Sequence, residues 1–281
     1  MPLQARAIRV NGLRTPLLEG MPAGADPSQA VVCVHGNPGC SQDWLDLAQE
    51  LAGFTRVVAL DMPGFGQADK PRDFPYNVES YAAHLGAALE VLGIRRAHLL
   101  LHDFGGPWGL AWCAAHPQAT ASLTLFDTGY LPGYRWHYLA RIWRTPLLGE
   151  LLQAISTRGG FHRLLQLGNP RGLPPAFIDR MYDHYDTGTR HAVLRLYRAT
   201  GDVTGLSKLL LPALATLRCP VLVIWGRHDI YIGADFAERQ REAFPGAQVH
   251  VLEDSGHWPF IDNPEAVRAL LLPHLRKSCA G

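Results

Sequence analysis

Residues 97–107 read Ala97-His98-Leu99-Leu100-Leu101-His102-Asp103-Phe104-Gly105-Gly106-Pro107. The apolar first half is typical of a strand buried on both faces of a parallel sheet. The two glycines allow a sharp turn into a closely packed helix. At such a strand-to-helix turn, the tip residue projects its side chain into a cleft above the sheet. The tip residue of this chain is Asp103, and we therefore expect a carboxylate in that cleft.

The chemistry of Asp103 differs from that of a serine in the same place. An ionised carboxylate needs no base to activate it, and it attacks saturated carbon by displacement, which leaves an alkyl ester on the protein. A serine would instead indicate acyl transfer. Taken alone, Asp103 could equally be the N-cap of the following helix, because Asp is a preferred N-cap residue. Other parts of the sequence are needed to distinguish these two interpretations.

Length and charge limit the class of protein. The chain has 281 residues and a formal net charge of +1, from 26 Lys plus Arg and 25 Asp plus Glu. This length favours one large core domain with an insertion. The near-neutral charge gives no reason to expect a nucleic acid or an anionic membrane surface as a partner. A small apolar substrate and water are the expected partners, and the sequence leaves open whether the protein is a monomer or a homodimer.

Targeting and cofactor signals are absent from the sequence. Its start lacks the apolar core of a secretion signal, and no stretch reaches the roughly 18 apolar residues that a membrane span needs, so we expect a cytoplasmic protein. The five cysteines are widely spaced and suit reduced packing thiols better than disulfides. The 13 histidines show no recognisable zinc spacing, and we expect neither a metal nor a cofactor.

Short apolar runs alternate with helical patterns. The helical patterns cover residues 78–92 and 106–116, and this alternation indicates βαβ units around a mostly parallel sheet, an α/β fold. A hairpin over residues 5–18, with Asn11-Gly12 as its turn, is expected at the sheet edge. The expected buried strands are residues 30–34, 55–60, 97–101, 122–126, 221–225 and 248–252.

The alternation stops between residues 131 and 215, where amphipathic helical patterns are separated by Pro and Gly. We predict an all-helical cap there, inserted between two parts of the core domain, residues 1–130 and 216–281. Residues 129–215 contain 11 Lys plus Arg and 5 Asp plus Glu, which favours solvated helix faces with ion pairs to the core over an anion site. The four expected cap helices cover residues 136–142, 147–155, 174–185 and 190–200.

The first buried parallel strand is followed by Val34-His35-Gly36-Asn37-Pro38-Gly39. Gly and Pro fix a turn at the edge of the sheet where Asp103 is expected, and this turn can aim the Asn37 N–H into the same cleft. Together with the Phe104 N–H, it would form an oxyanion hole with two donors. A plain tight turn is the alternative interpretation of this block alone.

Two later strands end in polar blocks. Gly226-Arg227-His228-Asp229 follows residues 221–225, and Asp254-Ser255-Gly256-His257-Trp258-Pro259 follows residues 248–252. Open α/β sheets build their sites at this edge, and the order nucleophile, acid, histidine is that of the hydrolase triad. Singly, Asp229 could be a helix cap and His257 a loop histidine. In this order and topology, the three residues predict a catalytic triad.

These blocks resemble those of the epoxide hydrolase and haloalkane dehalogenase group of α/β-hydrolases. HGNPG, the DMPGFG of residues 61–66, HDFGG, GRHD and GHWPF match in order, whereas the cap matches weakly. The resemblance implies that Asp103 is the nucleophile, His257 the base of the second step and Asp229 its orienting acid. Asp127 is an alternative acid, because it follows the strand at residues 122–126, where some dehalogenases place theirs; otherwise Asp127 is a turn residue.

The two substrate classes differ in how the leaving group is stabilised. The dehalogenases that resemble this chain bind halide with the Asn side chain after His-Gly, which Asn37 matches, and with an indole N–H directly after the nucleophile. Phe104 has no such donor. Trp136, Trp143 or Trp258 could replace the indole, although each also fits a packing role.

The similar epoxide hydrolases use tyrosines of the cap as proton donors. One lies in an Asn-Trp-Tyr-Arg block, which the stretch Val193-Leu194-Arg195-Leu196-Tyr197-Arg198 resembles in part. Tyr197 is therefore the expected donor, with a packing aromatic as the alternative. Tyr138 is the candidate second tyrosine, with Tyr134 as an option.

These residues predict an epoxide hydrolase that works through an alkyl ester on Asp103. A haloalkane dehalogenase is the alternative, and a ligand-binding protein that keeps the fold without turnover is a further one. The presence of all three triad residues argues against the last.

Overall fold

The computed structural model describes residues 3–280. Within them, one sheet runs in the order β1-β2-β4-β3-β5-β6-β7-β8. Its strands from β3 onwards are parallel to one another, and β2 pairs antiparallel with both β1 and β4. The mostly parallel α/β sheet predicted from the sequence is thus confirmed. The strands are β1 (Gln4–Val10), β2 (Leu13–Gly20), β3 (Gln29–Val34), β4 (Val57–Leu60), β5 (Arg96–His102), β6 (Thr120–Phe126), β7 (Val221–Gly226) and β8 (Gln248–Leu252).

The antiparallel edge is the predicted hairpin. Its two turn residues both have positive φ, 49° at Asn11 and 84° at Gly12. Asn-Gly suits this geometry because a two-residue hairpin turn of this kind needs left-handed backbone at both positions. The hairpin leaves the parallel strands in the interior of the sheet, where β5 lies between β3 and β6.

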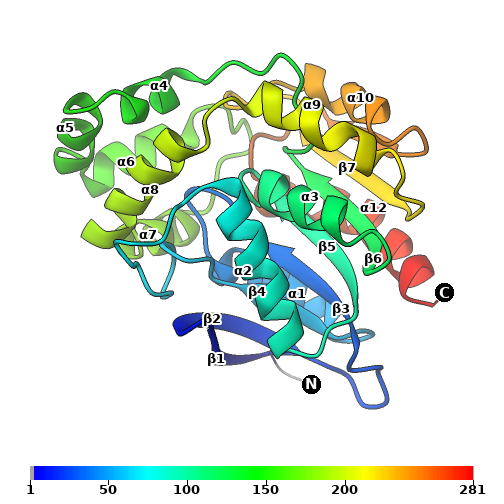
Figure 1. The fold of residues 1–281 in the computed structure, drawn as a ribbon. Helices are drawn as coiled ribbons and strands as arrows, with labels where there is room; N and C mark the ends of the chain where they lie inside the picture. Colours follow the sequence, from blue (N-terminus) through cyan, green and yellow to red (C-terminus); the bar gives the residue numbers. More distant parts are fainter. Residues whose placement is uncertain (1–2, 281) are drawn as a thin grey trace.

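Helices cover both faces of the sheet (Figure 1). On one face α2 (Val78–Val91) packs against α3 (Gly105–Ala115), as the helical patterns predicted. On the other face α1 (Leu45–Leu51) contacts β2 and β4, and α12 (Pro264–Cys279) contacts β5, β6 and β7. Shorter elements connect these layers: η1 (Ser41–Trp44), α10 (Asp235–Arg239), η2 (Gln240–Glu242) and α11 (Pro259–Asp262).

Between β6 and β7 the described chain is helical, and we call this segment, α4 to α9, the cap. It lies over one end of the sheet (Figure 1). Four of its helices were expected; α6 and α9 were not. No helix among the described residues is long and apolar enough to cross a membrane. The cap helices are α4 (Tyr138–Arg144), α5 (Leu148–Ala154), α6 (Arg158–Gln166), α7 (Pro175–Asp183), α8 (Thr187–Ala199) and α9 (Val203–Leu214).

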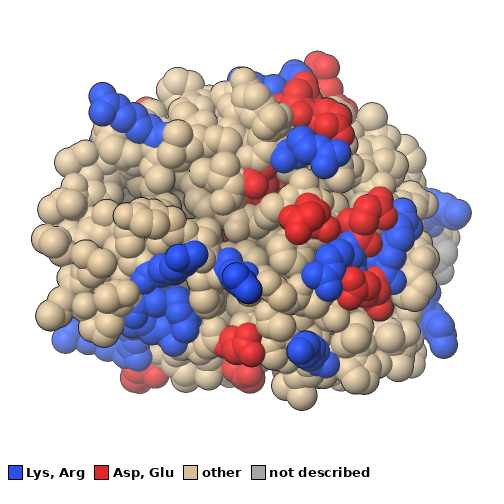
Figure 2. Space-filling model, turned by 90° about the horizontal axis from the view of Figure 1, so that it is seen from above, with Lys and Arg blue, Asp and Glu red and all other residues tan. Residues whose placement is uncertain are grey.

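Basic residues of the cap form ion pairs, and Arg171 pairs with Asp254 of the core, as expected. Arg198 pairs with Glu150 within the cap, and Lys70 of the core pairs with Asp186 at the start of α8, both within 2.9 Å. Figure 2 shows Lys and Arg clustered over the cap side of one face, whereas charges of both signs lie side by side over the core. These pairs are partly exposed, so each contributes little to stability.

Candidate active site

Asp103 lies at the tip of the turn between β5 and α3, with a φ of 48°. This left-handed conformation is unusual for a residue other than glycine and turns the side chain away from the strand. The carboxylate lies directly against Gly36, because a Cβ on that glycine would be only 2.3 Å from Asp103 Oδ1. The Gly of His-Gly-Asn-Pro-Gly is therefore needed for the close approach of two loops.

Asn37 binds the carboxylate from that second loop. Its backbone N–H donates to Asp103 Oδ1 over 2.7 Å. His35 holds the loop in place, because its Nε2 accepts from the Met62 N–H at 3.0 Å. Phe104, directly after Asp103, occupies the N-cap position of α3. Of the two predicted oxyanion donors, the structure thus brings the Asn37 N–H to the carboxylate, whereas the Phe104 N–H stays a prediction.

His257 lies between two carboxylates. Its Nδ1 is 2.7 Å from Asp229 Oδ2, and its Nε2 is 3.6 Å from Asp103 Oδ2. The other oxygen of Asp229 accepts from the backbone N–H groups of Tyr231 and Ile232, at 2.7 and 3.0 Å. These bonds fix the carboxylate of Asp229, which in turn orients the imidazole. The three residues come from the ends of β5, β7 and β8, the sheet edge expected from the sequence.

Charge interactions overcome burial in this group. Burial alone would raise the pKa of Asp103, but the hydrogen bond and charge of His257 lower it below its usual range. Burial would likewise lower the pKa of His257, yet the charges and hydrogen bonds of Asp229 and Asp103 raise it well above its usual range. The resting site therefore favours an ionised Asp103 beside an imidazolium.

Asp127 is buried near Asp103, Asp229 and His257 but is not hydrogen-bonded to any of them. One of its oxygens accepts from the Gly226 N–H at 2.8 Å, and the other is buried without a partner among the described residues. Burial and the nearby charge of Asp229 raise the pKa of Asp127 well above its usual range. A carboxyl group with a raised pKa supports an imidazolium less well than an ionised one does. Asp229 is the acid hydrogen-bonded to His257, over 2.7 Å.

The side chains of Asp127, Asp229 and His257 could in principle bind a cation, since their ligand atoms lie within 4.8 Å of one another. Metal binding needs a free lone pair on the imidazole nitrogen. The short contact from His257 Nδ1 to Asp229 is instead that of an N–H donating to a carboxylate. The arrangement favours a hydrogen-bonded pair over a metal centre.

The carboxylate of Asp103 faces a cavity of about 310 Å³ beneath the cap. The wall is mostly apolar, which suits an uncharged organic substrate. From the core the cavity is lined by Asn37, Asp103 and His257, and from the cap by residues that include Trp143, Phe161, Tyr185 and Tyr197.

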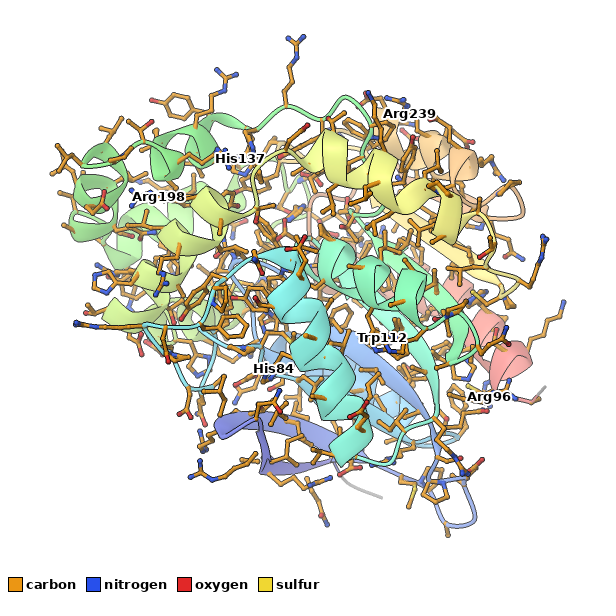
Figure 3. The ribbon with its side chains drawn as sticks, in the orientation of Figure 1. His84, Arg96, Trp112, His137, Arg198 and Arg239 are labelled. Atoms are coloured by element: carbon orange, nitrogen blue, oxygen red, sulfur yellow. The ribbon has the colours of Figure 1, made fainter. Side chains whose placement is uncertain are left out.

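Tyr197, on α8, meets two hydrogen-bonding side chains in this cavity. Asn37 Nδ2 donates to Tyr197 Oη over 3.3 Å, and His137 Nε2 lies 3.5 Å from the same oxygen. His137 precedes α4 (Figure 3), and its Nδ1 accepts from the Ala140 N–H as the N-cap of that helix. A neutral imidazole that accepts at Nδ1 carries its proton on Nε2, so His137 donates to Tyr197.

Two donors on the phenol oxygen leave the hydroxyl hydrogen of Tyr197 free to point into the cavity. Burial lowers the pKa of His137 to about 4, so the ring is neutral at physiological pH. Burial, followed by the charge of Asp103, raises the pKa of Tyr197 well above its usual range. The phenol therefore stays protonated and can donate a hydrogen bond or a proton.

The structure does not bring the other candidate tyrosines to this position. Tyr138 is 75% exposed and does not line the cavity. It is the first residue of α4, and its side chain points to solvent, which corrects its assignment as a second cap donor. Tyr134 donates its hydroxyl hydrogen to the Tyr231 carbonyl at 3.3 Å, so that hydrogen is already bound.

The tryptophans differ in what their indole N–H groups can do. Trp136 stacks on Phe104 and donates to the Gly201 carbonyl over 3.3 Å. Trp143 and Trp258 line the cavity, although Trp258 Nε1 itself is buried without a partner among the described residues. These two, rather than Trp136, are the indoles that could replace the donor missing at Phe104.

Sequence reasoning missed His137. It lies outside every block that matched, in the stretch Arg135-Trp136-His137-Tyr138. Its signal was a polar residue three positions before the Ala140 N–H, at the start of an amphipathic pattern, which marks an N-cap. Had His137 been assigned as the N-cap, Tyr138 would have been expected on the first turn of the helix.

Comparisons with known proteins bear on the family and the fold of this chain. Residues 29–264 match the model of the alpha/beta hydrolase fold family. A cis-3-alkyl-4-alkyloxetan-2-one decarboxylase of Shewanella oneidensis is 28% identical over an alignment of 264 residues, which covers 85% of this chain and 79% of that protein.

Two solved structures bear on the fold alone, because their sequence identity is low. The haloalkane dehalogenase DbeA of Bradyrhizobium elkani superposes with a TM-score of 0.85 at 24% identity, covering 99% of this chain and all 100% of that one. The epoxide hydrolase CorEH superposes with a TM-score of 0.82 at 19% identity, covering 98% of this chain and 99% of that one.

Proposed function

Because the chain belongs to the alpha/beta hydrolase family, we propose that it is an epoxide hydrolase that forms a vicinal diol through an alkyl ester on Asp103. One observation supports this choice above the others. Tyr197 Oη accepts from Asn37 and faces His137, which leaves its acidic hydrogen for a leaving oxygen held in the cavity of Asp103. An epoxide oxygen needs such a proton, whereas a halide does not.

The first step opens the ring. Asp103 Oδ2, the oxygen that the Asn37 N–H does not bind, attacks one ring carbon and forms a C–O bond. The bond from that carbon to the epoxide oxygen breaks, and its electron pair goes to the oxygen. Tyr197 donates its proton to this oxygen. The product is a β-hydroxyalkyl ester of Asp103.

The second step cleaves the ester. His257, in its neutral form, takes a proton from water, and the resulting hydroxide attacks the carbonyl carbon of the ester. Oδ1 then carries the negative charge, and the N–H groups of Asn37 and Phe104 stabilise it. Asp229 stabilises the imidazolium. Collapse breaks the ester C–O bond, and the leaving alkoxide takes the proton back from His257 to give the diol. Asp103 keeps one oxygen from water and is left as the carboxylic acid. Its proton replaces the one that Tyr197 gave up, which restores both the carboxylate and the phenol.

The decarboxylase relative supports the choice of a strained cyclic substrate, since its name gives an oxetan-2-one, a four-membered ring with a C–O bond, as its substrate. A haloalkane dehalogenase is the second candidate, and the two tryptophans of the cavity are the observation that favours it. An indole N–H from Trp143 or Trp258 and the Asn37 amide are the kind of donors that a halide needs.

Three substrates separate these functions. The purified protein is incubated with styrene oxide, with 1,2-dibromoethane and with a cis-3,4-dialkyl oxetan-2-one, and diol, bromide and CO₂ are measured. We expect diol as the main product. Bromide without diol would overturn the proposal in favour of the dehalogenase, and CO₂ alone in favour of the activity named for the relative. If none of the three substrates gives a product, the proposed catalysis would be contradicted, and a ligand-binding role without turnover would be favoured instead.

A further inference from the structure

We propose that the cavity contains a second subsite, formed by Gln153 and Tyr185, that binds a hydroxyl or carboxamide group at the far end of the substrate. This inference rests on the proposed function and names its substrate class: epoxides with an apolar stem and a neutral polar terminus.

The pair lies away from the reacting carboxylate. Gln153 is on α5, and Tyr185 is in the connection between α7 and α8. Figure 1 shows α5 at the end of the cap that is remote from the β5–α3 turn where Asp103 lies. Both side chains nevertheless line the same cavity as Asp103.

Each side chain is buried among apolar neighbours. Gln153 and Tyr185 are both only 5% exposed. The wall around them is apolar and includes Leu139, Leu152, Phe161 and Leu164. Burying a polar group in such surroundings costs free energy unless the group is hydrogen-bonded. The hydrogen bonds that this pair makes, and those that it lacks, therefore indicate what it can bind.

The pair leaves part of its own hydrogen-bonding capacity unused. Gln153 Nε2 donates to Tyr185 Oη over 2.9 Å. Among the described residues, nothing donates to Gln153 Oε1, and nothing accepts from the Tyr185 hydroxyl. One acceptor and two donor hydrogens, the second N–H of Gln153 and the hydroxyl of Tyr185, therefore remain for a ligand. Reversing the amide makes the Tyr185 oxygen the acceptor and still leaves two donor hydrogens, both on Gln153.

Arg190 fixes the pair from behind. Its guanidinium donates to the backbone carbonyls of Gln153, Tyr185 and Ser156, at 2.7, 3.1 and 3.3 Å. These bonds hold α5 and the Tyr185 segment in one geometry. They also occupy the guanidinium of Arg190, and Arg190 does not line the cavity.

The chemistry of the ligand group follows from these contacts. A group that fits must both donate and accept, as a hydroxyl or a primary carboxamide does. A carboxylate only accepts, and no Lys or Arg lines the cavity to neutralise it. Burial raises the pKa of Tyr185 to about 12, so its hydroxyl keeps its hydrogen over the physiological range.

The test compares epoxides of equal size with and without the terminal hydroxyl. 5,6-Epoxyhexan-1-ol and 1,2-epoxyheptane form one such pair, and the series extends from about four to about ten carbons because the stem must span the cavity. We expect kcat/KM for the wild type to favour the hydroxylated member by roughly tenfold or more at the fitting length. Tyr185→Phe and Gln153→Leu should each reduce this ratio towards one.

Tyr182→Phe is the matched control, because Tyr182 lies on the neighbouring helix α7, donates its hydroxyl hydrogen to the Ser156 carbonyl and does not itself line the cavity. The ratio should survive in this variant. A ratio near one at every length in the wild type, or a ratio that persists in both subsite variants, would overturn the inference even when plain epoxides are hydrolysed.

A binding measurement keeps the subsite testable apart from catalysis. Hexan-1-ol and pentyl methyl ether have equal size, but the ether cannot donate. Quenching of the fluorescence of Trp143 and Trp258, which line the cavity, reports binding of either compound. In the wild type, the alcohol should bind several-fold more tightly than the ether. In Tyr185→Phe, the two compounds should bind with similar affinity. Equal affinities would refute the subsite whether or not the protein opens epoxides.

Discussion

Asn37 connects the carboxylate of Asp103 to the hydroxyl of Tyr197, because its backbone N–H binds the first and its side-chain amide binds the second over 3.3 Å. One residue of the core thereby sets the position of the proposed nucleophile relative to the proposed proton donor of the cap. The separation of these two groups determines whether a three-membered ring can be opened between them.

Tyr197→Phe is expected to slow ring opening by about 10²–10⁴-fold, because the leaving oxygen loses its general acid. The variant keeps the ring that packs edge-on against Phe104 at 5.0 Å, so thermal stability should change little. The rate of ester formation in a single turnover and the melting temperature are the measurements. An unchanged rate of ester formation would return Tyr197 to a packing role.

His137→Asn tests the contact of His137 with Tyr197 apart from its N-cap bond to the Ala140 N–H. Asn remains a good N-cap for α4, but it is too short to replace the Nε2 donor to Tyr197. We expect slower ester formation with a near-normal melting temperature. His137→Ala serves as the comparison, since it loses the cap as well and should cost about 1 kcal/mol of stability. Equal ester formation in the Asn variant and the wild type would contradict a role of His137 in positioning Tyr197.

The site residues that could be predicted from the sequence are those at the ends of buried strands. Asp103, Asp229 and His257 each follow an apolar run, and parallel strands bring such ends to one edge of the sheet. The glycines beside them indicate close backbone approach, which the contact of Gly36 with Asp103 bears out. Local sequence was sufficient there because turn chemistry and strand order fix the geometry.

The cap was harder to predict because helix packing, rather than turn chemistry, determines which side chains face the cavity. Tyr138 and His137 are adjacent, yet only His137 reaches Tyr197. The helix α6 begins Arg158-Gly159-Gly160, which reads as a loop, and the Thr157 side chain caps it by accepting from the Gly160 N–H. Gln153 and Tyr185 lie far apart in sequence, and only the fold brings them together.

His257→Gln is expected to stop the reaction after the first step. Asp103 needs no base to attack, whereas water does. Exposure to epoxide should therefore add the mass of one substrate to the intact protein, on a peptide that contains Asp103. Asp103→Ala is the control and should gain no mass. An unmodified His257→Gln protein, after exposure that converts substrate in the wild type, would contradict the ester mechanism.

The two acids can be separated by amide substitutions of equal size. Asp229→Asn should reduce ester hydrolysis by about 10³–10⁴-fold, because the imidazolium loses its carboxylate. Asp127→Asn should have a far smaller effect, since the side chain is already held protonated and an amide oxygen can still accept from the Gly226 N–H. Stopped-flow measurement of the second step compares them. A larger loss in Asp127→Asn would make Asp127 the acid.

The pH dependence of the two steps should differ because Asp103 changes charge between them. In the resting protein, burial would lower the pKa of His257, but the charges of Asp229 and Asp103 raise it. Esterification neutralises Asp103, which removes one of the raising charges and lowers the pKa of His257 in the intermediate. Hydrolysis needs neutral imidazole, so its rate should fall as pH drops through that lower pKa.

Ester formation should persist to lower pH, because the pKa of Asp103 lies below its usual range and the carboxylate stays ionised. At the alkaline end, the raised pKa of Tyr197 keeps its proton in place. The fraction of protein present as ester during turnover should therefore increase as pH is lowered, which acid quenching and intact mass measure. His257→Gln has no imidazole base, so its ester should already accumulate at neutral pH, and its ester fraction should not increase as pH is lowered. An ester fraction that instead rises with pH in the wild type would rule out His257 as the base of the second step.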